Sequence, residues 1–280
     1  MKFRRIVVAI DGTPTSIAAL EATGELASAW GAELLGLFVE DTNLLRMASL
    51  PFAREVGSHS GTHRSINPGQ FEREFRSQSE RARNTLWFIA ERYRLTASFS
   101  VARGSVKREL IKALGEADML SMGKGGRSVA ATLGLGTTAR AIAQEAGGIV
   151  LQFSHVASVS GPPAVVYDGS PVADKALAAA AELAHTLDTR LSVLLPVELD
   201  IDRAKLEASA QDALKETRPV LAFRPIQTRC TADIARNVRS SGANVAVIPT
   251  GRPMLPTDAI ETLLGQFFGP VMLVGQDNTV

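Results

Sequence analysis

Short apolar runs alternate with stretches of helical periodicity along the first half of the chain. The apolar runs predict β-strands near residues 4–10, 33–39, 97–102, 118–122 and 148–153. Helical patterns fill the intervals, and the clearest lie near residues 15–30 and 69–94. Strands that alternate with helices form a parallel sheet with helices on both faces, so the pattern predicts a doubly wound α/β fold.

The same pattern begins again 157 residues later, where Asp11-Gly12-Thr13-Pro14 recurs as Asp168-Gly169-Ser170-Pro171. Glu25-Leu26-Ala27 recurs as Glu182-Leu183-Ala184 with the same offset. One offset kept through strand, turn and helix indicates two tandem copies of one α/β unit. Small residues and prolines near 157–163 mark the joint, so we predict domains at residues 1–158 and 159–280.

Composition and charge narrow the class of protein. With 45% hydrophobic residues, 21% charged residues and a net charge of +1, nothing indicates a nucleic-acid partner. No apolar run reaches the roughly 18 residues of a membrane span, and Asp11 ends the apolar start too early for a signal peptide. Cys230 is the only cysteine, which excludes an intrachain disulfide and favours a cytoplasmic location.

A glycine-rich loop joins the strand near 118–122 to a helix predicted over residues 137–146. Its glycines include Gly123, Gly126 and Gly136, and Thr137 follows the last of them. Backbone N–H groups and the positive end of the helix dipole converge at such a helix start, and glycine lets an anion come close. The loop therefore predicts a phosphate site, with a tight turn that holds no ligand as the alternative.

The spacing Gly-x2-Gly-x9-Gly-(Ser/Thr) in this loop resembles the ATP-binding signature of the universal stress proteins. The start of the chain, residues 5–14, and the run 34–39 resemble the first two strands of that family. The resemblance implies two tandem domains of the adenine nucleotide α-hydrolase-like, Rossmann-like fold. It also implies ATP as the ligand, with Mg²⁺ as a candidate companion ion.

The resemblance assigns a set of residues to the nucleotide: Asp11, Thr13, Val39, Gly123, Gly126, Arg127, Gly136, Thr137 and Thr138. In that assignment Val39 offers backbone groups to adenine, Asp11 faces the ribose or the adenine, and the residues from Gly126 onward surround the phosphates. A carboxylate that only forms the turn before Gly12 is the alternative for Asp11. No residue is assigned to catalysis. None is assigned to a metal either, because His59 and His63 lack a third ligand.

Of two other nucleotide-binding motifs, the dinucleotide fingerprint is disfavoured by its context and the P-loop is excluded. Residues 134–139 satisfy the dinucleotide fingerprint, but they follow the fourth predicted strand, and no acidic residue occurs between Glu145 and Asp168. The chain contains no Gly-x4-Gly-Lys-(Ser/Thr), which excludes a P-loop.

The second copy lacks the phosphate loop. Aligning residues 117–123 with 243–249, and Ile149-Val150 with Pro270-Val271, makes that loop five residues shorter and sets Thr257-Asp258 opposite Gly136-Thr137. Val39 becomes Pro196, which has no N–H to offer. We therefore predict ATP in the first copy only.

The leading functional hypothesis is an ATP-binding regulator of a stress response. Catalysis has less support, because beyond Asp11 no carboxylate lies near the predicted phosphates. The alternatives are a slow ATP hydrolase or nucleotide-dependent transferase on the same fold, and a binding scaffold in which the nucleotide is structural.

Two expectations concern architecture. The last strands of the copies, residues 149–153 and 270–274, are both apolar, so we predict that they pair and make the chain a pseudo-dimer. Pairing of whole chains into a homodimer through another surface stays open. Residues 41–68 contain prolines and glycines and are predicted to form a long loop.

Overall fold

The structure, a computed structural model, describes residues 1–48, 54–56, 63–65, 68–124, 137–153, 158–196, 202–215, 219–226, 231–250 and 267–277. The strands of the first half are β1 (Arg5–Ala9), β2 (Glu33–Asp41), β3 (Arg54–Val56), β4 (His63–Ser65), β5 (Ala97–Gly104), β6 (Met119–Gly123) and β7 (Ile149–Phe153). Its helices are α1 (Pro14–Trp30), α2 (Thr42–Ala48), α3 (Pro68–Tyr93), α4 (Val106–Leu114) and α6 (Thr137–Ala146). The second half contains β8 (Pro163–Val166), α7 (Pro171–Thr186), β9 (Leu191–Pro196), α8 (Arg203–Ala213), β10 (Leu221–Ile226), α9 (Thr231–Ser240), β11 (Val245–Pro249) and β12 (Val271–Val274).

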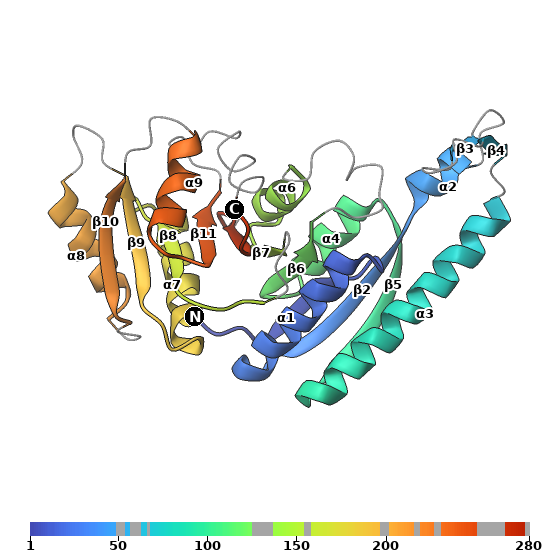
Figure 1. Cartoon of the computed structure of the whole chain (residues 1–280), viewed down its shortest axis with the longest axis horizontal. Helices are drawn as coiled ribbons and strands as arrows, with labels where there is room; N and C mark the ends of the chain where they lie inside the picture. The colour runs from blue at the N-terminus through green and yellow to red at the C-terminus, as the bar shows by residue number, and fades with distance from the viewer. Residues whose placement is uncertain are drawn as a thin grey trace.

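One ten-stranded sheet runs through both halves in the order β10-β9-β8-β11-β12-β7-β6-β1-β2-β5 (Figure 1). Outward from the middle, the order β7-β6-β1-β2-β5 of the first half corresponds to the order β12-β11-β8-β9-β10 of the second. Every pair of neighbouring strands within a half is parallel. The predicted doubly wound α/β fold is therefore confirmed. The predicted boundary at residue 158 falls between β7 and β8 and stays a prediction.

Helices cover the two faces of the sheet. α1, α3, α7 and α8 contribute to the core on one face, and α4, α6 and α9 contribute to the core on the other. β1 shows why both faces need a cover, because Ile6 and Val8 belong to the first core while Val7 belongs to the second. Successive side chains of a strand point to opposite faces, so an apolar run without alternation is buried on both.

Equivalent residues begin the first helix of each half. Thr13 caps α1 by accepting a hydrogen bond from the Ser16 backbone N–H at 3.3 Å, and Pro14 occupies the first turn. In the second half, Ser170 caps α7 by accepting from the Ala173 backbone N–H at 3.3 Å. The repeated sequence therefore produces the same strand, turn and helix twice.

The prediction of a long loop over residues 41–68 is wrong in part. Asp41 still belongs to β2, and its Oδ1 accepts a hydrogen bond from the Asn43 backbone N–H at 2.9 Å at the start of α2. Farther along, β3 and β4 pair as an antiparallel ladder. His63 lies in β4, whereas His59 lies outside the described residues.

The two halves meet where the sequence analysis placed the seam. β7 and β12 pair antiparallel, with Leu151 opposite Met272 and Val150 opposite Leu273. All four of these side chains are buried. The ladder therefore covers an apolar edge on each half.

Within the described part of the chain, no helix is long and apolar enough to cross a membrane.

Candidate functional site

A pocket of about 110 Å³ opens at the carboxyl ends of three neighbouring strands. Asp11 borders it just after β1, Val39 near the end of β2, and Gly123 at the end of β6. β1 lies between β6 and β2 in the sheet, so the chain changes direction across the sheet at this place. In open α/β sheets, such a switch in strand order is where ligands bind. The structure thus brings together three of the residues predicted from the sequence.

The backbone of Val39 faces a gap in the sheet. The Ile10 N–H donates to the Leu37 carbonyl at 2.9 Å, and β1 has its last ladder pair at Ala9 and Leu37. Residues two apart in a strand direct their backbone groups to the same side. The N–H and the C=O of Val39 therefore point toward the side of β1, beyond the place where β1 ends.

Asp11 forms the turn between β1 and α1. Its Oδ1 accepts from the Thr13 backbone N–H at 3.0 Å and from the Thr13 hydroxyl at 2.6 Å. Gly12 adopts a left-handed conformation with φ of 77°, which explains the glycine. In the second half, Asp168 makes the same pair of bonds with Ser170, at 3.2 and 2.7 Å. The turn-forming role considered for Asp11 is thus present, and the same residue borders the pocket.

Gly123 is required by packing against α1. A Cβ at this position would lie 2.6 Å from the Thr15 carbonyl carbon and 2.7 Å from the Ser16 backbone nitrogen. Backbone atoms cannot move aside as a flexible side chain can. The end of β6 therefore approaches the first turn of α1 so closely that only glycine fits.

The phosphate-loop residues are described only at their two ends. Lys124, the first residue after β6, donates its N–H to the Phe153 carbonyl at 2.6 Å and accepts at its own carbonyl from the Thr15 hydroxyl at 3.0 Å. Thr137 begins α6, and Thr138 lies half-buried in its first turn. Gly126, Arg127 and Gly136 lie outside the described residues.

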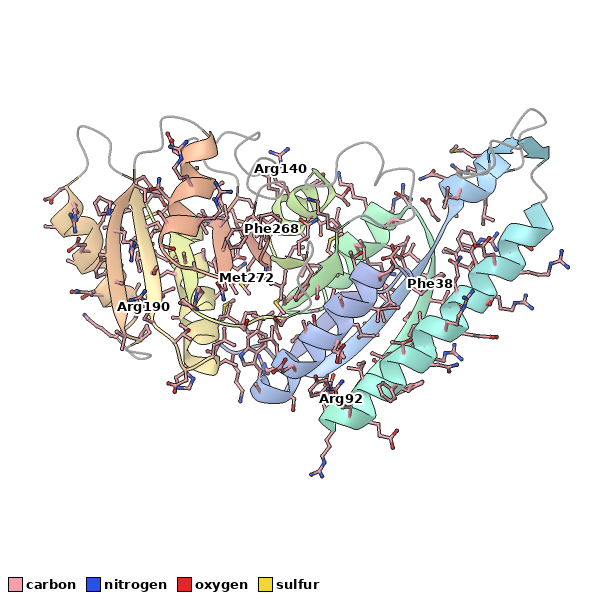
Figure 2. All side chains as sticks on the ribbon, in the orientation of Figure 1. Phe38, Arg92, Arg140, Arg190, Phe268 and Met272 are labelled. Carbon is pink, nitrogen blue, oxygen red and sulfur yellow. The ribbon has the colours of Figure 1, made fainter. Side chains whose placement is uncertain are left out.

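Other residues that line the pocket were not assigned to it by the sequence analysis, among them Phe38, Asp41, Phe75 and Gln78. Phe38 points from β2 toward α3 (Figure 2), where its ring meets that of Phe75 edge to face with centroids 6.4 Å apart. Phe75 and Gln78 lie three residues apart, so they share one side of α3. That spacing is present in the sequence, but the many charged residues around it hide which side of α3 faces the pocket.

The equivalent region of the second half has different contacts. Tyr167, which occupies the place of Ile10, is fully buried and donates its hydroxyl hydrogen bond to Asp174 Oδ1 at 2.8 Å. Its Oη also lies 3.0 Å from Ser209 Oγ. Burial raises the pKa of Tyr167 to about 12, with Asp174 adding to the rise and Ser209 opposing it.

The sequence alignment of the two halves agrees with their ladders. Leu120 lies opposite Val150 in the first half, and Ala246 lies opposite Val271 in the second. Pro196, which the alignment sets opposite Val39, is the last residue of β9, whereas Thr257 and Asp258 lie outside the described residues.

Comparison with known proteins extends these observations. The model of the universal stress protein family matches residues 2–151. The fold is similar to that of a universal stress protein from Archaeoglobus fulgidus DSM 4304, with a TM-score of 0.73 and 18% identity over 99% of this chain and 98% of that chain. It is also similar to a functionally unknown protein from Pseudomonas aeruginosa PAO1, with a TM-score of 0.62 and 15% identity over 99% of this chain and 94% of that one. No curated protein matches the sequence. Since the family model covers more than half of its length, the chain belongs to the universal stress protein family.

Proposed function

We propose that the protein binds ATP in its first half and acts as a nucleotide-responsive regulator of a stress response. The observation that carries the proposal is the pocket in which Asp11, Val39 and Gly123 meet at the carboxyl ends of three strands. We place the nucleoside in this pocket, and the glycine loop starts beside it at Lys124, directly after Gly123.

The base end of the pocket suits adenine. Its walls include apolar side chains such as Phe38, Val106 and Met122, and a flat ring needs such surfaces on its faces. At the edge of the ring, the N–H and C=O of Val39 offer one donor and one acceptor. Adenine presents the complement, a ring nitrogen beside an amino group, whereas guanine in the same pose presents a ring N–H beside a carbonyl. We therefore expect ATP to bind more tightly than GTP.

The phosphate end is proposed to lie between the glycine loop and the start of α6. α6 has ten residues and begins at Thr137, so its first turn offers N–H groups and the positive end of a dipole. Gly126 and Gly136 would leave space for the phosphates, Arg127 would supply positive charge, and Thr138 would supply a hydroxyl.

The second half offers a poorer site. Pro196 stands where Val39 stands in the first half and has no N–H for a base. The sequence between β11 and β12 is shorter than the sequence between β6 and β7, and Asp258 would set a negative charge near the position of the phosphates. One nucleotide per chain is therefore expected.

A slow ATP hydrolase is the second candidate function. It requires a positioned water and a metal clamp on the phosphates. Within the part of the chain that the structure describes, no group of three or more His, Cys, Asp and Glu side chains could hold a metal ion. Any Mg²⁺ is expected to arrive with the nucleotide, and measuring phosphate release decides between binding alone and turnover.

Calorimetric titration of the purified chain with ATP, ADP, AMP, adenosine and GTP tests the proposal. We expect one site per chain and weaker binding of GTP. ATP at about 100 times its dissociation constant should add roughly 2.7 kcal/mol to the stability of the half that binds it. Release of phosphate during the same incubation would favour the hydrolase. Failure of every adenine nucleotide to bind would overturn the proposal.

A further inference from the structure

The first residue of the glycine loop is fixed by its backbone from two sides. The N–H of Lys124 donates to the Phe153 carbonyl of β7 at 2.6 Å. The carbonyl of Lys124 accepts from the Thr15 hydroxyl of α1 at 3.0 Å. The peptide from which the loop starts therefore has a defined orientation relative to both the sheet and α1.

The Thr15 hydroxyl also lies next to the turn that contains Asp11. Its Oγ1 is 3.2 Å from Thr13 Oγ1, and the Thr13 hydroxyl lies 2.6 Å from Asp11 Oδ1. A hydroxyl has one proton. The Thr13 proton goes to Asp11 and the Thr15 proton goes to the nearer Lys124 carbonyl, so the two threonine oxygens lie side by side with no proton of their own between them. Asp11, Thr13, Thr15 and Lys124 thus form a line from the nucleoside pocket to the start of the loop.

The second half shows that the fold does not depend on the hydrogen bond between Thr15 and Lys124. There the Thr250 N–H donates to the Val274 carbonyl at 2.7 Å, which repeats the bond between Lys124 and Phe153. Thr15, however, is replaced by Val172, 157 residues later, and valine has no proton to donate. α7 still begins at Pro171 with its Ser170 cap. A threonine is therefore not needed for the turn or the helix, and it occurs in the half that has the long glycine loop.

We propose that Thr15 is a positioning residue for the phosphates: its hydroxyl fixes the first peptide of the glycine loop relative to the Asp11 turn. The inference rests on the proposed binding of ATP to the first half. Thr15 acts through the Lys124 carbonyl and does not touch the nucleotide itself. Loss of the hydroxyl leaves the pocket for the nucleoside intact and removes one of the two bonds that orient the Lys124 peptide, so the ligand has to supply that orientation.

The test compares ATP with adenosine, which has no phosphate, by calorimetric titration of the full chain. In Thr15→Val, which copies Val172, we expect ATP affinity to fall about tenfold, the loss that corresponds to one hydrogen bond. Adenosine affinity should stay within about twofold of wild type, because no contact of the base or ribose changes. Thr15→Ser keeps the hydroxyl and should restore most of the ATP affinity.

Each remaining outcome has a defined meaning. An unchanged ATP affinity in Thr15→Val, or equal losses for ATP and adenosine, overturns the positioning role while leaving ATP binding by the wild type in place. Failure of Thr15→Ser to restore ATP binding also overturns it, since packing rather than the hydroxyl would then matter. A wild-type chain that binds neither ligand overturns the proposed function, and this inference with it.

Discussion

The hydroxyl of Tyr167 donates a hydrogen bond to Asp174 at 2.8 Å, and these two residues correspond to Ile10 and Ile17, 157 residues earlier. In the first half, Ile10 and Ile17 border an open groove of about 420 Å³ between α1 and α3. In the second half, the corresponding pair bonds between the end of β8 and the first turn of α7, and Ser209 of α8 lies 3.0 Å from the Tyr167 hydroxyl. The first half therefore has an open groove at a place where the second half has a polar contact between side chains.

The Tyr167 contact predicts a specific loss of stability in alkali. The pKa of Tyr167 is raised from the ordinary 10.0 to about 12, so the folded state holds the phenol proton more tightly than the unfolded state. Its contribution is therefore complete below pH 10.0 and is lost as the pH rises toward about 12.

Urea unfolding at a series of alkaline pH values, with Tyr167→Phe as the control, measures this effect. At pH 8, Tyr167→Phe should be less stable than wild type by about 1 kcal/mol, because one hydrogen bond to a buried group is lost. The difference should shrink or change sign as the phenol of the wild type ionises. Two curves that stay parallel across this range would show that Tyr167 is not the group responsible.

Gly123→Ala should destabilise the protein by about 1–3 kcal/mol, because the new methyl group would overlap the backbone of Thr15 and Ser16. Gly115→Ala is the matched control. There a Cβ meets nothing closer than the Lys112 carbonyl oxygen at 3.4 Å, and φ is −63°, so we expect almost no change. The midpoint of thermal unfolding compares the two variants. Equal midpoints would contradict the close approach of β6 to α1.

Val39→Pro copies Pro196 of the second half and should weaken both ATP and adenosine by at least about tenfold, because it removes the N–H offered to the base. The ladder with β5 should survive, since the N–H of Val39 faces the side of β1. Val39→Ala keeps the backbone groups and serves as the control. Calorimetry with both ligands reads out the result, and a Val39→Pro chain that binds like Val39→Ala would exclude this backbone contact.

A fragment of residues 1–158 should contain more copies per particle than the full chain, or aggregate. Without β12, the edge of β7 loses the partner that covers Val150 and Leu151. Light scattering coupled to size-exclusion chromatography measures the mass of both species at equal concentration. A fragment that stays soluble and monomeric at about 100 μM would argue against the seam as the interface that the two halves need.

Much of the fold could be predicted from the sequence because its information is local or repeated. Apolar runs located the strands, the Asp-Gly turn located the start of α1 and α7, and two apolar last strands located the seam. The pairing of β3 with β4 could not be predicted, since three-residue strands lack a periodic pattern.

The candidate site was only partly predictable for a different physical reason. Asp11, Val39 and Gly123 follow strands, and the ends of parallel strands meet at one edge. Phe75 and Gln78 come from α3, and which side of a long charged helix faces a pocket depends on packing across the chain. The packing role of Gly123 was also hidden, because it depends on how closely α1 approaches β6.

The pairing of β7 with β12 leaves β5 and β10 as the outer strands of the described sheet. These two edges differ, so a contact between β5 of one molecule and β10 of the next would not close on itself and would continue as a filament. β10 carries the exposed Pro225, which has no N–H for an incoming strand. Joining two α/β units into one sheet thus gives the sheet two different edges. Pro225 at one of them hinders the addition of molecules end to end.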